Sequence, residues 1–257
     1  MPIITLTSDW GDKDHYAGAV KGAILNKMSD ITIVDISHKI PPFDIEQAAF
    51  ILRNSYPSFP PGTVHIIGIN TEESDKTGHT VVEYKRQFFI GTDNGIFSML
   101  FDGKPDKVGE LTINQDSDYF TFSTRDRFVS AAVHLASGNP MNEICDLKDN
   151  IVEKILLKPV EDAGMIKGHV IYIDNYENVI TNITESYFKE IRKGRGFSIV
   201  FRSYEISAIS KSYNDVARGE ILALFDTGGY LEIAINQGNA SGLLGLDLKD
   251  MIRIEFT

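Results

Sequence analysis

The sequence predicts an α/β domain over residues 1–160, followed by a small all-β domain over residues 166–257. In the first part, short apolar runs alternate with helical patterns, which indicates a central parallel or mixed sheet, expected to be mostly parallel, with helices on both faces. In the second part, short β-rich runs are separated by Gly, Asn and Asp turns, which is typical of an antiparallel barrel or sandwich. The stretch KPVEDAGMIKG, residues 158–168, marks the expected boundary.

Three apolar runs in the first part predict buried strands. They are IITLT (3–7), ITIVDIS (31–37) and TVHIIGI (63–69). The next two runs, HTVVEY and QFFIGT, predict a β-hairpin.

Four segments of the first part have helical patterns. The first covers residues 15–28 and places Val20, Ile24 and Met28 inward. The second covers residues 44–56, where Asp44 can cap the helix, and the third covers residues 93–101. The fourth covers residues 125–138, ends at Gly138 and has one apolar face, formed by Phe128, Ala131, Ala132 and Leu135.

In the second part, five short runs predict strands and one segment predicts a helix. The strands are GHVIYID, GFSIVF, ILALF, YLEIAI and MIRIEF. Only TESYFKEIRKG is expected to be helical there.

Composition narrows the classes of partner. The chain has 257 residues, 42% of them hydrophobic, and a net charge of −11, so nucleic acid is not expected as a partner. No apolar run approaches the roughly 18 residues of a membrane span, and the N-terminus lacks signal-peptide features. Cys145 is the only cysteine, and nothing near it indicates an activated thiol, so we expect it to be buried. We therefore expect a cytoplasmic protein without a membrane partner.

Polar residues gather directly after the predicted strands, which is where α/β sheets bind their ligands. We therefore expect a functional cleft at this end of the sheet. The residues are Asp9, Asp12 and Asp14 after the first strand, Asp35, Ser37 and His38 after the second, and the segments INTEES (69–74), TDNG (92–95) and TFSTRD (121–126).

Two interpretations of these polar residues stay open. Asp9, Asp14, Asp35 and His38 are residue types that ligate metals, although their spacing matches no metal motif. Taken singly, Asp9 and Asp14 are more often caps of a turn and a helix, and His38 is more often a satisfied loop histidine. Three carboxylates in one loop also repel a phosphate, and the chain has no Gly-rich phosphate loop.

In the second part, three clusters combine polar and aromatic residues. They are DNYENVITN (174–182), SYNDV (212–216) and FDTGGYLEIA (225–234). The first and third also fit ordinary strand connections, and Tyr213 also fits core packing.

Seven segments occur in a fixed order along nearly the whole chain. They are TSDWGDKDHYAGAVKGAI, IVDISHKIPPFDIEQAAFIL, FPPGTVHIIGI, FIGTDNGIFS, TFSTRDRFVSAAVHLASG, YIDNYENVITNI and GGYLEIAINQGNASGLLGL. Together they resemble the S-adenosyl-L-methionine hydroxide adenosyltransferase family, which is related to the fluorinase and chlorinase enzymes. The resemblance implies an N-terminal α/β domain, a C-terminal β-barrel and a homotrimer. S-adenosylmethionine (SAM) would lie between the N-terminal domain of one subunit and the C-terminal domain of its neighbour.

The resemblance also implies a set of SAM-binding positions in the first part. Asp9 falls where family members hold the two ribose hydroxyls, and a carboxylate accepts hydrogen bonds from a diol well. Asp14 falls where a carboxylate meets the methionine end, and Phe43 falls where an aromatic ring walls the ribose.

The remaining implied positions lie in the second part. Asp174, Thr227 and the backbone near Gly228 would take the methionine ammonium and carboxylate. Around the adenine, the resemblance implies a hydrogen bond from Asn178, stacking by Tyr213 and proximity of Ala240.

The nucleophile pocket departs from the family pattern. Asn70 stands in place of a family Asp, Thr77 or Gly78 in place of an Arg, and Ser123 in place of a His; in the family these residues handle the water. The polar residues nearby are Glu72, Glu73 and His79. Thr124 falls where the halogenases place a small hydroxyl residue against the halide, but their Tyr-Pro loop is absent.

We therefore expect an enzyme that attacks C5′ of SAM with water and yields adenosine and L-methionine. SAM or adenosine is the expected ligand, and no metal or other cofactor is expected. The first alternative is a binding protein of the same fold that holds SAM or adenosine without turnover. A metal-dependent hydrolase and a SAM-dependent halogenase are the remaining alternatives.

Overall fold

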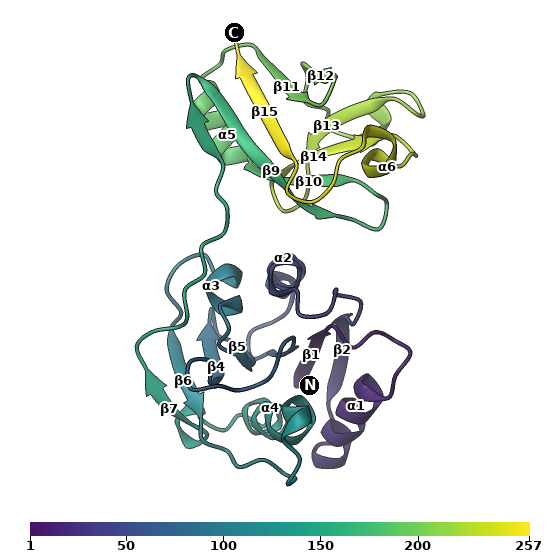
Figure 1. The fold of residues 1–257 in the computed structure, drawn as a ribbon. Helices are drawn as coiled ribbons and strands as arrows, with labels where there is room; N and C mark the ends of the chain where they lie inside the picture. Colours follow the sequence, from purple (N-terminus) through teal and green to yellow (C-terminus); the bar gives the residue numbers. More distant parts are fainter. The chain divides into compact units, whose positions relative to one another are not determined.

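The computed structural model describes residues 1–257, and the chain divides into two compact units (Figure 1). Unit 1 comprises Met1–Ile155 and unit 2 comprises Leu156–Thr257.

Unit 1 contains a seven-stranded sheet in the order β2-β1-β3-β5-β4-β6-β7. The strands β2, β1, β3 and β5 pair in parallel, whereas the pairs β5-β4, β4-β6 and β6-β7 are antiparallel. The strands are β1 (Ile3–Ser8), β2 (Thr32–Ser37), β3 (Val64–Gly68), β4 (His79–Tyr84), β5 (Gln87–Thr92), β6 (Lys107–Leu111) and β7 (Cys145–Lys148).

The sheet is therefore mixed, which is one of the two arrangements that the sequence indicates, and the expectation of a mostly parallel sheet holds only for the half formed by β2, β1, β3 and β5. The cause is the predicted hairpin, which the structure contains as β4 and β5. Its two turn residues, Lys85 and Arg86, both have positive φ, as a tight hairpin turn requires. The chain reverses there, so β4 runs against β5, and β6 and β7 extend the antiparallel half.

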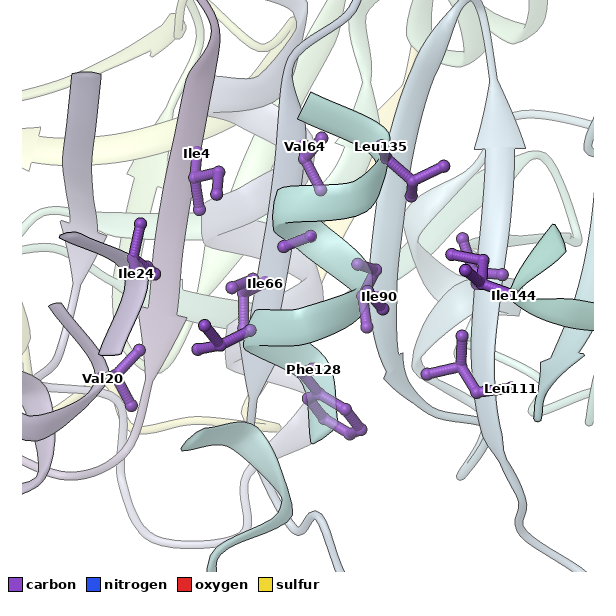
Figure 2. Close-up of a cluster of buried hydrophobic side chains, with 14 of the residues drawn as sticks. Ile4, Val20, Ile24, Val64, Ile66, Ile90, Leu111, Phe128, Leu135 and Ile144 are labelled. Carbon is purple, nitrogen blue, oxygen red and sulfur yellow. The ribbon is translucent and has the colours of Figure 1, made fainter. Parts of the chain in front are cut away.

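Helices cover both faces of this sheet, as the sequence predicts (Figure 1). On one face, α1 and α4 pack Val20, Ile24 and Leu135 against the sheet, which contributes residues such as Ile66 (Figure 2). On the other face, α2 and α3 bury a second cluster that includes Leu52 and Phe97. The α-helices of unit 1 are α1 (Tyr16–Lys27), α2 (Ile45–Ser55), α3 (Ile96–Leu100) and α4 (Val129–Ala136).

Two of the predicted helices differ from their expected extent. The segment 93–101 forms only the short α3, because Gly95 has a left-handed φ of 102° and the helix begins after it. The segment 125–138 opens with a π-helical turn, Thr124–Phe128, before α4. Its predicted apolar face is confirmed, since Phe128, Ala131, Ala132 and Leu135 are all buried. Single-turn 3-10 helices complete unit 1 at Tyr56–Ser58, Phe120–Phe122 and Met141–Glu143.

The prediction that residues 31–37 form a fully buried strand is wrong. This segment forms β2, which is the edge strand of the sheet, and most of its residues are only half-buried. One side of an edge strand meets no neighbouring strand, so charged groups can line it. Asp35 accordingly forms an ion pair with Lys21 of α1 at 2.5 Å.

Unit 2 is a nearly closed, antiparallel, barrel-like sheet in the order β12-β11-β15-β9-β10-β14-β13, with β8 paired to β9. Strand β9 is long enough to join both halves: Met165–His169 pairs with β15, and Val170–Ile173 faces β10. The strands are β8 (Val160–Asp162), β9 (Met165–Ile173), β10 (Val179–Thr184), β11 (Phe197–Phe201), β12 (Tyr204–Ile206), β13 (Ile221–Phe225), β14 (Tyr230–Ile235) and β15 (Met251–Phe256).

Two α-helices and one 3-10 turn accompany this sheet. They are α5 (Glu185–Arg192), which the sequence predicts, α6 (Ala240–Leu244), and the turn Tyr213–Asp215. The expectation of a single helix in this part is wrong, because α6 has only five residues and is too short to show a helical period. Its start is fixed locally instead, since the Asn239 side chain accepts a hydrogen bond from the Gly242 N–H.

None of the helices combines the length and the apolar character that crossing a membrane requires. The single cysteine, Cys145, is buried, and burial raises the pKa of its thiol. It therefore packs as a small apolar side chain.

The N-cap of α2 leads to a first prediction. Asp44 Oδ1 accepts the Gln47 N–H at 3.0 Å, as the sequence predicts for this cap. Replacing Asp44 with Ala should lower the free energy of unfolding by about 1 kcal/mol. Asp44→Asn keeps an acceptor and should lower the free energy of unfolding by only about 0.3 kcal/mol. Urea denaturation of the three proteins measures this difference, and equal losses in both variants would contradict the role of the cap.

Candidate functional site

The carboxyl end of β1 leads directly to the first predicted site residue. Asp9 is half-buried, and its Oδ2 accepts the backbone N–H of Phe43 at 2.8 Å. Phe43 has a φ of +67°, a conformation that is uncommon for a residue with a side chain, and its side chain is 72% exposed. The Asp9 carboxylate thus fixes the backbone of a residue whose aromatic ring is exposed, and the structure brings these two predicted residues together.

An aromatic cluster follows Asp9 and joins three segments of unit 1. The Trp10 ring stacks on His38 and meets the edge of Phe122, each at 5.7 Å between centroids. The Trp10 indole also lies on Gly68, at the end of β3, so closely that a Cβ at Gly68 would clash with it. Phe122 directly precedes Ser123, so this cluster anchors the segment that carries two further predicted site residues.

The other polar residues of the first two loops have separate partners. Asp12 forms an ion pair with Lys39 at 2.9 Å. His38 Nδ1 lies 2.6 Å from Ser8 Oγ, whereas its buried Nε2 lies 3.2 Å from Asp35 Oδ1 without forming a hydrogen bond, so the interpretation of His38 as a satisfied loop histidine holds for one ring nitrogen only. Asp14 is exposed, and the interpretation of Asp14 as a helix cap is wrong, because α1 begins after His15 and has no side-chain cap.

The positions of the predicted nucleophile pocket lie on two neighbouring segments. Asn70 follows β3, is exposed and has a φ of +47°, and its carbonyl accepts a hydrogen bond from Asn94 Nδ2. Ser123 and Thr124 are buried at the start of the π-helical turn. Thr124 Oγ1 is buried without a hydrogen-bond partner, which is costly unless a ligand or water supplies one.

A cavity of about 1060 Å³ opens beside these segments within unit 1. Ser123 lines it together with the loop that follows β3, the end of β5 and the segment after β7. Its charged or ionisable lining residues are Glu72, Glu73, Asp75, Lys76, His79, Asp93, Glu110, Arg127 and Lys148.

Three of these lining residues form a hydrogen-bonded cluster, which we call the Glu73 cluster: Glu73, His79 and Arg127. One guanidinium nitrogen of Arg127, Nη1, lies 3.0 Å from Glu73 Oε2 and 3.0 Å from His79 Nδ1. Glu73 Oε1 also accepts the backbone N–H of His79 at 3.2 Å. Burial lowers the pKa of His79, so its ring is neutral near pH 7.

The sequence singled out Glu73 and His79 but missed Arg127. Arg127 stands four residues after Ser123, and residues four apart lie on the same side of a helix. That spacing is the signal by which the sequence could have identified it. Glu72 lines the same cavity but is not part of the cluster.

A second ion pair lines the same cavity. The Asp93 side chain is buried, with Oδ2 2.8 Å from Lys148 Nζ, and its Oδ1 accepts the backbone N–H of Val152 at 2.9 Å. Asp93 therefore anchors the segment after β7 to the end of β5, which is a structural role.

In unit 2, Asp174 and Asn178 belong to the turn between β9 and β10. Asp174 Oδ1 accepts the backbone N–H groups of Tyr176 and Asn178, and Asn178 Nδ2 donates to Asp174 Oδ2 at 3.2 Å. Ala240 lies at the same place, because the N–H of the next residue, Ser241, donates to the Glu177 carbonyl of this turn. The structure thus groups Asp174, Asn178 and Ala240.

Tyr213 lies over a buried carboxylate. Its hydroxyl donates to Glu232 Oε1 at 2.7 Å, and the side chain is 42% exposed, so it is not a core residue. Burial, together with the negative charges of Asp174 and Asp226, raises the pKa of Glu232 to about 7. Glu232 therefore binds the Tyr213 hydroxyl and is also within the electrostatic influence of Asp174 and Asp226, which lie on separate turns.

Thr227 and Gly228 lie in the turn between β13 and β14. The Asp226 side chain accepts hydrogen bonds from the backbone of this turn, including the Tyr230 N–H at 2.8 Å. The register of β10 and β14 pairs Thr184 with Tyr230 and Val179 with Ile233. This turn therefore lies at the Thr184 end of β10, whereas the Asp174 turn lies at the Val179 end. The structure does not group Thr227 with Asn178.

The residues of the metal alternative do not converge. Asp35 faces Lys21 and His38, whereas Asp9 faces the Phe43 backbone and Asp14 is exposed. No group of three or more His, Cys, Asp or Glu side chains in the structure is arranged to hold a metal ion.

Comparison with known protein families decides the relationship of this chain. The SAM hydroxide adenosyltransferase N-terminal domain model matches residues 4–145, and the corresponding C-terminal domain model matches residues 168–253. The chain belongs to the SAM hydroxide adenosyltransferase family. The resemblance carried by the seven sequence segments is thereby confirmed.

Curated relatives match over nearly the whole chain. The (R)-S-adenosyl-L-methionine hydrolase of Methanocaldococcus jannaschii is 32% identical and covers 99% of this chain and 96% of its own length. A fluorinase of Actinoplanes sp. is 23% identical and covers 91% of both chains. A solved structure of an uncharacterized conserved protein from Thermotoga maritima is 30% identical, with a TM-score of 0.88 over 98% of this chain and 99% of its own.

The buried Glu232 leads to a second prediction. Because its pKa is raised from 4.5 to about 7, the folded protein binds a proton that the unfolded chain releases between these pH values. Stability is therefore lost as the pH rises through this range. Glu232→Gln keeps an acceptor for Tyr213 and removes the buried charge, so its stability relative to wild type should rise by up to ~3 kcal/mol from about pH 5 to about pH 8.

Urea denaturation of wild type and Glu232→Gln at both pH values measures this change. The matched control is Glu205→Gln, which changes an exposed carboxylate on β12 and should show no comparable dependence. Parallel profiles for wild type and Glu232→Gln would contradict the raised pKa.

Proposed function

We propose that this protein hydrolyses S-adenosylmethionine at C5′ to adenosine and L-methionine. The observation that carries the proposal is the Asp9–Phe43 pair in a chain of this family, because it joins a carboxylate acceptor to the backbone of a residue whose aromatic ring is exposed. A ribose diol needs the first group and the sugar ring face suits the second. The relatives named (R)-S-adenosyl-L-methionine hydrolase, one of them 32% identical, support the same reaction.

The acidity of the loop after β1 favours a cationic nucleoside over a nucleotide. Asp9, Asp12 and Asp14 would repel phosphate, whereas SAM has no phosphate and carries a positive sulfonium. In this proposal Asp9 binds the ribose diol, Phe43 walls the ribose and Asp14 faces the amino-acid end of SAM. Asp12 has no role, since Lys39 already neutralises it.

Unit 2 supplies a complementary set of groups in this proposal. The negative charges of Asp174 and Asp226, which lie on turns at opposite ends of β10, both act on Glu232, and an acidic surface of this kind suits the methionine ammonium group. The exposed face of Tyr213 suits stacking on adenine, with Asn178 at the adenine edge and Ala240 close by. Thr227 and the Gly228 backbone are assigned to the methionine carboxylate.

We further propose a homotrimer in which a unit 1 and a unit 2 of adjacent protomers complete each site. Light scattering coupled to size-exclusion chromatography should give three times the chain mass of 28.6 kDa. A monomeric mass for a protein that still cleaves SAM would contradict this assembly.

The reaction class sets what the protein must do. Water attacks C5′ opposite the sulfur, the C5′–S bond breaks, and its electron pair leaves the sulfur neutral in methionine. A carboxylate pressed on the sulfonium would stabilise the charged ground state more than the transition state, so an anchor on the diol is the better use of Asp9. The protein must also hold the water about 3–3.5 Å from C5′, in line with the leaving group. No metal or other cofactor is part of this proposal.

A second candidate function is a SAM or adenosine-binding protein without turnover. It is favoured by one observation: Asn70 and Ser123 stand where the family carries the Asp and His of its water-handling groups. The two candidates differ in one measurement, which is the formation of adenosine and methionine from SAM by the purified protein. A halogenase would instead form a 5′-halogenated nucleoside in the presence of halide.

A fourth prediction tests the ribose anchor. Asp9→Ala removes the acceptor for both the diol and the Phe43 N–H, and a hydrogen bond to a charged group contributes about 1.5–3 kcal/mol. The dissociation constant of adenosine, measured by calorimetry, should therefore rise about 10-fold to 100-fold. The matched control is Asp12→Ala in the same loop, which should bind as wild type does. Equal affinities of wild type and Asp9→Ala would exclude Asp9 from the site.

A further inference from the structure

The Glu73 cluster has one member that keeps free acceptor capacity toward the cavity. Glu73 accepts one hydrogen bond at each carboxylate oxygen, from Arg127 Nη1 and from the His79 N–H. Its side chain is 42% exposed, and Glu73 lines the cavity. A carboxylate offers about four lone-pair sites, so Glu73 retains acceptors for a water molecule.

All three guanidinium nitrogens of Arg127 form hydrogen bonds within the protein. Its Nε donates to the Ile113 carbonyl at 2.9 Å, and Nη2 donates to the Leu111 carbonyl. Its Nη1 serves Glu73 and His79. Because the guanidinium is planar and anchored at each nitrogen, it holds the Glu73 carboxylate in one orientation.

Both ring nitrogens of His79 also have hydrogen-bond partners within the protein. Its side chain is only 2% exposed, and Nε2 lies 2.9 Å from the Thr71 carbonyl, so Nε2 carries the proton and Nδ1 accepts from Arg127. Both ring nitrogens are thus used inside the protein. Within the cluster, only Glu73 can receive a proton from a molecule in the cavity.

The cluster adjoins the predicted nucleophile pocket. Arg127 lies one helical turn after Ser123, and both line the cavity. Glu73 and His79 lie on the segment that follows Asn70, and Thr71 accepts the His79 hydrogen bond. This segment leaves β3, whose last residue pairs with the last residue of β1, just before Asp9.

We propose that Glu73 is the catalytic base of this chain, which orients the attacking water, while Arg127 and His79 are positioning residues. The inference rests on the proposed hydrolysis of SAM. The water oxygen forms the new bond to C5′ and the C5′–S bond breaks toward sulfur. The water proton passes to a Glu73 oxygen and then to solvent, so SAM and water yield adenosine, methionine and one proton.

The test compares Glu73→Gln with wild type and with Glu110→Gln. Glu110 lines the same cavity from β6 and has no part in the cluster, so it controls for removing a negative charge there. We expect kcat of Glu73→Gln to fall at least about 100-fold, the typical range for loss of a general base. The dissociation constant of SAM should change less than about threefold, and Glu110→Gln should retain kcat.

A rescue experiment separates catalysis from structure. Glu73→Ala leaves room for a small carboxylate, so added formate should restore part of kcat in that variant and leave Glu110→Gln unaffected. Thermal melting of each variant checks that the fold persists.

The outcomes separate the two proposals. If wild type forms no adenosine from SAM, the proposed function fails. If wild type turns over and Glu73→Gln keeps kcat within about threefold, or if only SAM binding weakens, Glu73 is not the base and the proposed function stands. A 100-fold loss that formate partly reverses supports the inference.

Discussion

The parallel pairing of Ser8 on β1 with Gly68 on β3 is the constraint on which the site in unit 1 depends. It places the chain leaving β1 beside the chain leaving β3, so Asp9 and Asn70 emerge at the same edge of the sheet. The Trp10 indole packs directly on Gly68 and so holds the two chain segments together. This close contact is possible because residue 68 has no side chain, which would displace the indole. Phe122, against the same indole, then brings the segment with Ser123 to that edge.

The cavity at this edge combines charges that are expensive to bury singly. The structure pairs them instead: Arg127 with Glu73, and Lys148 with Asp93. Buried ion pairs contribute little net stability, so such pairs are better understood as devices that fix orientation. Both carboxylate oxygens of Asp93 bind protein groups, namely Lys148 and the Val152 N–H, whereas Glu73 keeps exposed acceptor sites. This difference points to Glu73 as the reactive group.

Unit 2 contains a buried carboxylate, Glu232, that has no cationic partner, in contrast to Glu73 and Asp93 of unit 1. Glu232 is 3% exposed, receives the Tyr213 hydroxyl and lies in the field of Asp174 and Asp226. No cation offsets it within hydrogen-bonding distance, so the folded chain holds a destabilising negative region above about pH 7. In the proposed function, the methionine ammonium would relieve this repulsion, which makes the region a binding determinant rather than a structural one.

The sequence by itself determined the local features: most of the strands and helices, the Asp44 cap, the β4–β5 hairpin and the family. These follow from hydrophobic periodicity, capping and motif order, which act over a few residues. Only the tertiary structure decided the mixed sheet, the edge position of β2, the short α6 and the Glu73 cluster. Arg127 lies 54 residues from Glu73 and meets it only because the strands and the π-helical turn pack together, and no local pattern encodes such a contact.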